Sequence, residues 1–129
     1  MKYNHTSYGF LVDDISKAVN FYRDTMGFRV VRQSDTFAQM NSGAGVAFFF
    51  WKWGHLCEHL GEQAMSRVKH RVQSAIRFDR PEDVDAAYEE LKAEGVEFVA
   101  APGDWEWNAH AAYFVDGDGY MWELYCWLQ

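Results

Sequence analysis

Cysteine and basic residues are scarce in this chain of 129 residues. Its two cysteines, Cys57 and Cys126, lack a CxxC spacing, so we expect reduced thiols that pack as small apolar side chains rather than a disulfide framework. The 12 Lys and Arg are scattered against 19 Asp and Glu, which leaves a formal charge of −7. Without a basic stripe, nucleic acid is not expected as a partner.

Long apolar runs are also absent. No stretch reaches the roughly 18 apolar residues of a membrane span, and the first ten residues carry no long apolar segment. We therefore expect a soluble, cytoplasmic protein that has no membrane partner. What the chain has in abundance is hydrophobic residues, at 49%, and aromatic residues, at 18%, which suffice for one sizeable core in one compact unit.

A helix is predicted in the first part of the chain. Ile15, Val19 and Tyr22 recur at helical spacing. Asp13 and Asp14 stand where a helix starts, and Gly27 stands where it stops. A strand-like segment, YGFLV, precedes this helix, and three β-rich segments separated by turn residues follow it. The three are FRVVRQ (28–33), TFAQMN (36–41) and GVAFFFW (45–51).

The second part repeats this order of one strand, one helix and three strands. The spacing from Asp83 to Gly95 nearly equals that from Asp14 to Gly27, and Pro81 stands in the first helical turn. The repeated segments are VQSAIRF (72–78), PEDVDAAYEELKAEG (81–95), VEFVA (96–100), HAAYFV (110–115) and YMWELYCW (120–127). The sequence therefore predicts two βαβββ modules.

One domain over 1–129 is expected, with module one at 1–53, a partly helical linker at 54–70 and module two at 71–129. A linker of this length is long for a simple connection, so the modules could pair within one chain or across two. Apolar residues near it, Trp51, Trp53 and Leu56, suggest surface that one chain leaves open. We therefore expect a homodimer.

Three segments carry a family resemblance: VDDISKAVNFYRDTMGF (12–28), EDVDAAYEELKAEGVEF (82–98) and FVDGDGYMWEL (114–124). They resemble the vicinal oxygen chelate superfamily, which includes glyoxalase I, bleomycin-resistance proteins and extradiol dioxygenases. The resemblance implies an α+β fold of two βαβββ modules. Because the superfamily holds lyases, isomerases, dioxygenases and drug-binding proteins, it does not name a reaction.

The resemblance also implies where a metal would bind, with one ligand from the first strand and one from the last strand of each module. Gln73 and Glu123 fall on the two positions of module two. In module one, Ser7 replaces a histidine and the strand 45–51 offers no strong donor. We therefore expect no metal cofactor; an enzyme of this family would use Zn, Ni, Mn or Fe, here held by Gln73, Glu123 and His5.

Further histidines lie in the linker. His55, Cys57 and His59 would share one face of a strand, whereas His55 and His59 alone would share one face of a helix. The helical pair, with Cys57 or Glu58 nearby, could bind zinc. A solvated helix face is the preferred interpretation of this pattern.

Glu123 is unusual because it interrupts the apolar strand of DGDGYMWEL. With a four-residue turn at 116–119, Ala112 would lie opposite Glu123 and His110 one diagonal step away on the same face. The two side chains could then form a general base or a ligand anchor, with the proton affinity of Glu123 raised by its apolar neighbours. The alternative is a polar pair without a functional role.

Strand alternation predicts which side chains face a cavity. Gly9 and Ala75 are small and would leave room in it, and Trp105 and Trp107 would close over a flat guest. The inner face is predicted to carry Ser7, Gly9, Leu11, Gln73, Ala75, Arg77, Met121, Glu123, Tyr125 and Trp127. The outer face is predicted to pack Tyr8, Phe10, Val12, Ile76, Phe78, Trp122 and Leu124 under the helices. The expected ligand contacts are Ser7, Gln73, Arg77, Trp105, Trp107, Met121 and Tyr125.

Two functions fit these patterns. The first is a metal-free protein that binds an aromatic or cationic small molecule in an apolar cavity, as bleomycin-resistance proteins do. The second is an enzyme. It would be either a divergent metal-dependent lyase, isomerase or dioxygenase, or a metal-independent acid–base catalyst that uses Glu123 and His110.

Overall fold

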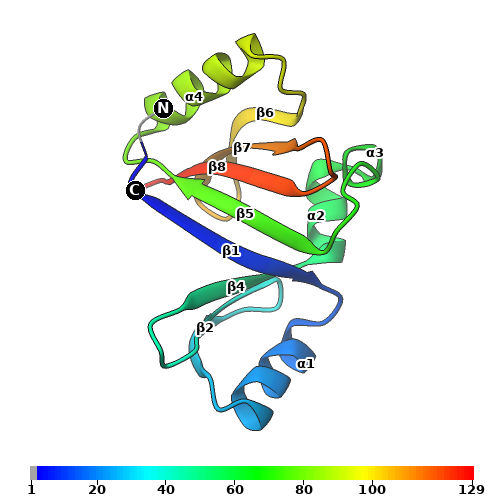
Figure 1. Ribbon diagram of the computed structural model, residues 1–129, viewed down its shortest axis with the longest axis vertical. Helices are drawn as coiled ribbons and strands as arrows, with labels where there is room; N and C mark the ends of the chain where they lie inside the picture. The colour runs from blue at the N-terminus through cyan, green and yellow to red at the C-terminus, as the bar shows by residue number, and fades with distance from the viewer. Residues whose placement is uncertain (1–2) are drawn as a thin grey trace.

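One mixed sheet of eight strands forms the centre of the described chain, residues 3–129 of this computed structural model (Figure 1). Residues 1 and 2, at the start of the predicted first module, lie outside the described residues. The strands follow the order β2-β3-β4-β1-β5-β8-β7-β6. They are β1 (His5–Val12), β2 (Arg29–Gln33), β3 (Phe37–Asn41), β4 (Ala47–Lys52), β5 (Val72–Arg77), β6 (Phe98–Trp105), β7 (Ala109–Val115) and β8 (Met121–Trp127).

The first predicted helix is confirmed at both ends. The Asp14 side chain accepts a hydrogen bond of 3.0 Å from the backbone N–H of Lys17, which caps α1 (Ile15–Asn20). The second half differs from the prediction, because η1 (Phe21–Thr25) is a π-helical turn. Gly27 then ends the helical segment with a φ of 74°, a backbone conformation that glycine adopts without strain.

The two modules join at the middle of the sheet. β1 runs antiparallel to β5, with Ser7 opposite Ala75, and each module's last strand runs parallel to its own first strand. This arrangement places the modules of one chain side by side, with β1 and β5 adjacent and α1 and α4 (Pro81–Ala93) at opposite ends of the molecule (Figure 1). Pairing within one chain is therefore what this structure contains.

Separate hydrophobic clusters cover the outer face of the sheet. Helix α1 contributes Ile15 and Val19 to a cluster with Ala38, Met40 and Phe50. Helix α4 makes the corresponding contact in module two, where its cluster consists of Val84, Ala87, Ile76, Phe78, Leu124 and Cys126. The predicted packing of Ile76, Phe78 and Leu124 under a helix is confirmed.

The outer face of β1 departs from the prediction. Tyr8 is 57% exposed and Phe10 is 39% exposed, although both were expected to pack under the helices. The reason is their place in the sheet, because β1 lies between the regions that α1 and α4 cover (Figure 1). Phe10 still contacts the rings of Phe48 and Phe50 at centroid distances of 6.0 and 6.2 Å.

The linker forms α2 (Trp53–Leu60) and α3 (Glu62–Met65), which pack on the inner face of the sheet. Trp51 and Leu56 are buried in that cluster, at 6% and 0% exposed. The expectation that these residues leave an open apolar surface was wrong, since the linker folds back as a cover. Within residues 3–129, none of the helices is long and apolar enough to cross a membrane.

Candidate functional site

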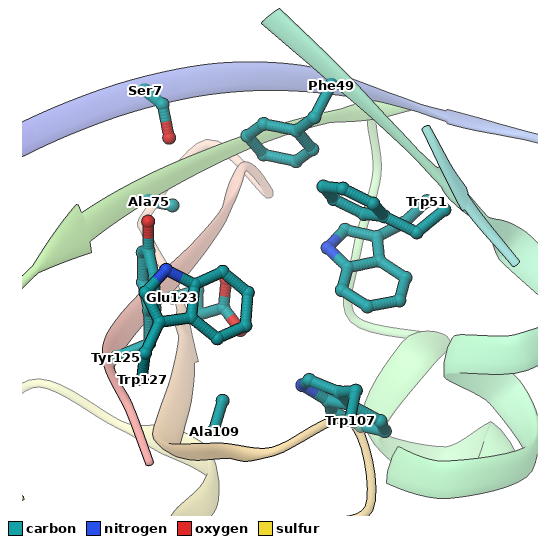
Figure 2. Close-up of a pocket in the computed structure, with 10 residues that line it drawn as sticks. Ser7, Phe49, Trp51, Ala75, Trp107, Ala109, Glu123, Tyr125 and Trp127 are labelled. Atoms are coloured by element: carbon teal, nitrogen blue, oxygen red, sulfur yellow. The ribbon is translucent and has the colours of Figure 1, made fainter. Parts of the chain in front are cut away.

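The inner face of the sheet curls around a cavity. Its deepest part, beside Glu123, has a volume of about 40 Å³, and two outer hollows of about 100 and 260 Å³ share several of its lining residues. Figure 2 shows Phe49, Trp51 and Trp107 across the cavity from Tyr125 and Trp127. The lining residues of the deep part are Ser7, Phe37, Phe49, Trp51, Ala75, Trp107, Ala109, Glu123, Tyr125 and Trp127.

Glu123 is the acidic group of this lining, and it is only 5% exposed. The Tyr113 hydroxyl donates a hydrogen bond of 2.5 Å to Oε2, and the Gln73 side-chain amide donates one of 3.3 Å to Oε1. An ionised carboxylate offers about four acceptor positions, so these two donors leave capacity for a donor on a ligand.

Burial sets the protonation of this group. It raises the pKa of Glu123 from its ordinary 4.5 to about 7, because the charged form loses its hydration, while the hydrogen bond from Tyr113 acts in the opposite direction. Burial and the nearby carboxylate also raise the pKa of Tyr113 well above its usual value, so the tyrosine remains a donor. Glu123 can therefore take or release a proton near neutral pH.

The predicted pair of Glu123 with His110 was wrong. The turn between β7 and β8 spans five residues, so Val115 pairs with Met121 and Tyr113 lies opposite Glu123. A shift of one residue turns every following side chain to the other face of a strand. His110 consequently lies away from the cavity, where its ring nitrogens contact Asp104 and Asp85, each at 2.7 Å.

The cause of that turn is visible in Asp116. Its Oδ1 accepts hydrogen bonds of 3.0 Å from the backbone N–H groups of Asp118 and Tyr120, which closes the longer loop. The two carboxylates on His110 raise its pKa against the opposing effect of burial. His110 thus links β6, β7 and α4 and does not serve the cavity.

Aromatic rings stack into the wall of the cavity. Trp51 lies 4.7 Å from Phe37 and 5.5 Å from Trp107 between ring centroids. Trp105 stacks on Trp107 at 5.1 Å and donates a hydrogen bond of 3.1 Å to the backbone carbonyl of Ala111. Trp105 stands at the end of β6 rather than in the predicted loop, so it supports Trp107 and does not itself line the cavity.

The other expected contacts fall into three groups. Ser7 and Tyr125 line the cavity, and Gln73 lies behind Glu123 as its hydrogen-bond donor. Arg77 lines an outer hollow. Met121 is fully buried in the inner core cluster, away from the cavity lining.

Gly9 was expected to leave room, but the space over it is filled. A Cβ atom at this position would come within 2.3 Å of the Phe49 ring and 2.5 Å of its backbone oxygen. Glycine here allows close approach by Phe49 and adds no cavity volume.

The family's metal positions can be tested against this geometry. Phe49 pairs with Gly9 as Glu123 pairs with Ala75, so the phenyl ring stands where module two has its carboxylate. The other two positions hold Ser7 and Gln73, and the Gln73 amide donates to Glu123. One carboxylate and one amide make a poor donor set for a divalent transition metal, so the residues do not fit the group.

Neither of the other metal ligand sets is assembled. His5 lines an outer hollow that Glu123 does not reach. His55 and His59 share a face of α2, which is the helical one of the two expected alternatives, with His55 against Trp51 and His59 in contact with Glu106. Across residues 3–129, no group of three His, Cys, Asp or Glu converges on a possible metal position.

Sequence reasoning missed three residues that shape the site. Phe37 and Phe49 would have been found by extending strand alternation to the third and fourth strands, where they share the inner face with Trp51. Tyr113 could not be found in that way, because its pairing with Glu123 depends on the length of the β7–β8 turn.

Comparisons with known proteins agree with this fold. The chain is 29% identical to the uncharacterised protein YraH of Bacillus subtilis (strain 168), over 89% of this chain and 91% of that protein. It is 33% identical to a manganese-dependent 2,3-dihydroxybiphenyl 1,2-dioxygenase of Geobacillus genomosp. 3, over 96% of this chain. The match covers 36% of that dioxygenase, so the chain spans about a third of its length.

A solved structure gives the same result for the fold. A methylmalonyl-CoA epimerase variant of Streptomyces coelicolor, in complex with 2-nitronate-propionyl-CoA, superposes with a TM-score of 0.68 at 18% identity and covers 99% of this chain and 100% of its own. The sequence model of one family matches residues 2–124. With these matches and the two βαβββ modules, the resemblance found in the sequence is confirmed, and the chain belongs to the Glyoxalase/Bleomycin resistance protein/Dioxygenase superfamily.

Proposed function

We propose that this protein binds an aromatic small molecule in the inner cavity without a metal, with Glu123 as the polar group that orients the ligand. The observation that carries this proposal is a buried carboxyl group, with a pKa of about 7, at the floor of a cavity walled by aromatic side chains. Binding cavities of proteins combine such apolar walls with a few convergent polar groups.

The shape of the cavity supports one orientation of the ligand. The part beside Glu123 has room for a small group, since about 40 Å³ holds only a few water molecules. The wider hollow, lined by Phe37, Trp51, Trp107 and Trp127, suits the flat body of the ligand. A hydroxyl or similar donor therefore points inward to Glu123 while the ring stacks outside it.

Fluorescence of the cavity tryptophans tests this function with 2-naphthol as the probe. Binding should quench Trp51 or Trp107, and Glu123→Gln should weaken it about tenfold, because the charged acceptor for the hydroxyl is lost. Glu89→Gln, on the exposed surface of α4, is the matched control and should bind as the parent does. Equal binding by Glu123→Gln would place the polar anchor elsewhere.

Acid–base catalysis at the same carboxyl group is a second candidate, favoured by its pKa near neutrality. Glu123 would take a proton from carbon and return one from solvent, with Tyr113 as its hydrogen-bond donor and without His110. Incubation with 2-tetralone in D₂O tests this role. Deuterium uptake beside the carbonyl above the buffer rate should vanish in Glu123→Gln. Uptake at the buffer rate in the parent would exclude acid–base catalysis by Glu123.

The metal-dependent lyase, isomerase or dioxygenase is not supported by the donor set, although one relative is named for such an activity.

A homodimer stays a prediction. Trp51 and Leu56, on which the dimer prediction was partly based, are buried. The exposed rings of Tyr8 and Phe10 on the outer face of β1 support a dimer interface instead. Sedimentation of the parent protein at micromolar concentration should give a dimer, and a monomer would contradict the prediction.

A further inference from the structure

Two arginines lie at the mouth of the cavity. Arg32 from β2 and Arg77 from β5 line an outer hollow of about 100 Å³, together with His5 and Gln39. The described residues that line this hollow include no Asp or Glu. In a chain with a net charge of −7, a hollow with cationic side chains and no acid is a local exception.

Both guanidinium groups keep their charge available. The Arg32 Nε–H donates to Oε1 of Gln39 and the Arg77 Nε–H donates to Oδ1 of Asn4, each at 3.3 Å. Over residues 3–129, neither group lies within ion-pair distance of a carboxylate. Neutral amides therefore orient these arginines without neutralising them.

Most other arginines of the chain are neutralised by a neighbour. The ion pairs are Arg23–Asp24, Arg67–Glu97, Arg71–Asp13 and Arg80–Asp83. Arg32 and Arg77 differ from these four in that no acidic side chain of the described residues pairs with them, so both are available to an acidic group of a ligand.

The hollow is continuous with the deep cavity, because Ser7, Phe37, Phe49, Tyr125 and Trp127 line both. The Arg32 guanidinium carbon lies 5.5 Å from the Trp127 ring and 5.7 Å from the Phe37 ring. A flat ligand against these rings would place a substituent at its outer end beside the guanidinium groups.

We propose that Arg32 and Arg77 form an anion subsite for the carboxylate of an aromatic acid whose ring lies against Phe37 and Trp127. This inference rests on the proposed function, because it assigns the outer end of the same ligand. The planar fork of an arginine matches the two oxygens of a carboxylate, and the deep end near Glu123 takes the opposite, uncharged end of the molecule. An aromatic acid fits this arrangement better than the cationic ligand considered from the sequence.

Calorimetry with matched probes tests the subsite, using 2-naphthoate and its neutral analogue 2-naphthamide. The parent should bind the acid at least about tenfold more tightly than the amide. Added NaCl should weaken binding of the acid and leave binding of the amide unchanged. The single variants Arg32→Gln and Arg77→Gln should each reduce this preference for the acid over the amide. Arg29→Gln, on the same strand as Arg32 but outside the hollow, removes an equal charge and should keep the preference.

Each other result overturns the inference in a distinct way. If acid and amide bind equally, the aromatic cavity stands and the anion subsite does not. If Arg29→Gln reduces the preference as much as Arg77→Gln does, the effect is net charge and not a site. Tighter binding of 2-naphthyl phosphate than of 2-naphthoate would make the ligand class an aryl phosphate, and binding of none of the three probes would remove the proposed function as well.

Discussion

Corresponding positions of the two modules carry opposite chemistry on one backbone plan. In module two, Glu123 lies beside Ala75 and accepts a hydrogen bond from Tyr113 on the neighbouring strand. In module one, Phe49 lies beside Gly9, and its neighbour across the strand pair is Gln39, which binds Arg32. The same register thus holds a titratable group in one half and a rigid aromatic wall in the other.

This difference shows that the repeated fold fixes where equivalent residues lie in the sheet but does not fix the chemistry of their side chains. A carboxylate needs hydrogen-bond donors when it is buried, and module two supplies Tyr113 and Gln73. A phenyl ring needs only space, and Gly9 supplies it. The half with the acid holds a carboxyl group whose pKa is near 7, while the half with the ring provides a wall of the cavity.

The largest expected effect comes from removing the wall of module one. Phe49→Ala should lower the free energy of unfolding by about 3 to 5 kcal/mol, because it leaves a cavity between β1 and β4. Urea denaturation measures this change. Val46→Ala, at a side chain that is 60% exposed, is the control and should stay within about 0.5 kcal/mol of the parent. A loss below about 1 kcal/mol for Phe49→Ala would show that the ring is not packed as described.

Glu123 should give the protein a pH dependence that Phe49, at the corresponding position of module one, cannot give. The pKa of Glu123 is raised to about 7 in the folded state from an ordinary value of 4.5. The folded state therefore binds this proton more tightly, so the stabilisation is full below pH 4.5 and is lost as the pH rises through 7.

Relative to Glu123→Gln, which cannot titrate there, the parent should lose about 3 kcal/mol of unfolding free energy between pH 4.5 and 8. Urea denaturation of both proteins across this range measures the difference, in which the effects of all other titrating groups cancel. Parallel curves would mean that Glu123 has an ordinary pKa and is solvated.

A smaller effect separates the two inner positions beside these groups. Gly9→Ala should destabilise the protein by about 1 to 3 kcal/mol, because the new Cβ would collide with the backbone oxygen of Phe49. Ala75→Gly, at the corresponding position of module two, should cost only about 0.5 to 1 kcal/mol through chain entropy. Thermal or urea unfolding of both variants measures these losses of unfolding free energy. Equal losses would contradict the predicted difference between the two positions.

No effect is expected from chelation. Because Ser7 and Phe49 stand at the module-one positions, the melting temperature should be the same with and without EDTA, and Mn²⁺ or Zn²⁺ should not raise it. Metal analysis of untagged protein gives an independent measurement. A chelator-induced drop of several degrees, or stoichiometric metal, would show that donors outside the described arrangement complete a site.

Local patterns in the sequence predicted much of this molecule. Helix starts at Asp14 and Pro81, the stops at Gly27 and Gly95, and the repeated order of elements follow from short-range preferences that tertiary contacts did not override. Alternation along β8 placed Glu123 and Tyr125 on the inner face. These features depend on residues close together in the chain, which is why a sequence pattern contains them.

Features that depend on pairing between distant segments could not be predicted from local sequence patterns. One additional residue in the loop after Val115 exchanged His110 for Tyr113 as the neighbour of Glu123. The burial of Trp51 and Leu56 depended on where α2 and α3 packed, and the position of Arg32 and Arg77 around one hollow depended on the curl of the sheet. The sequence by itself determined the two modules, their inner faces and the shortage of metal donors; only the tertiary structure decided which groups meet, because register and sheet curvature are set by contacts between segments far apart in the chain.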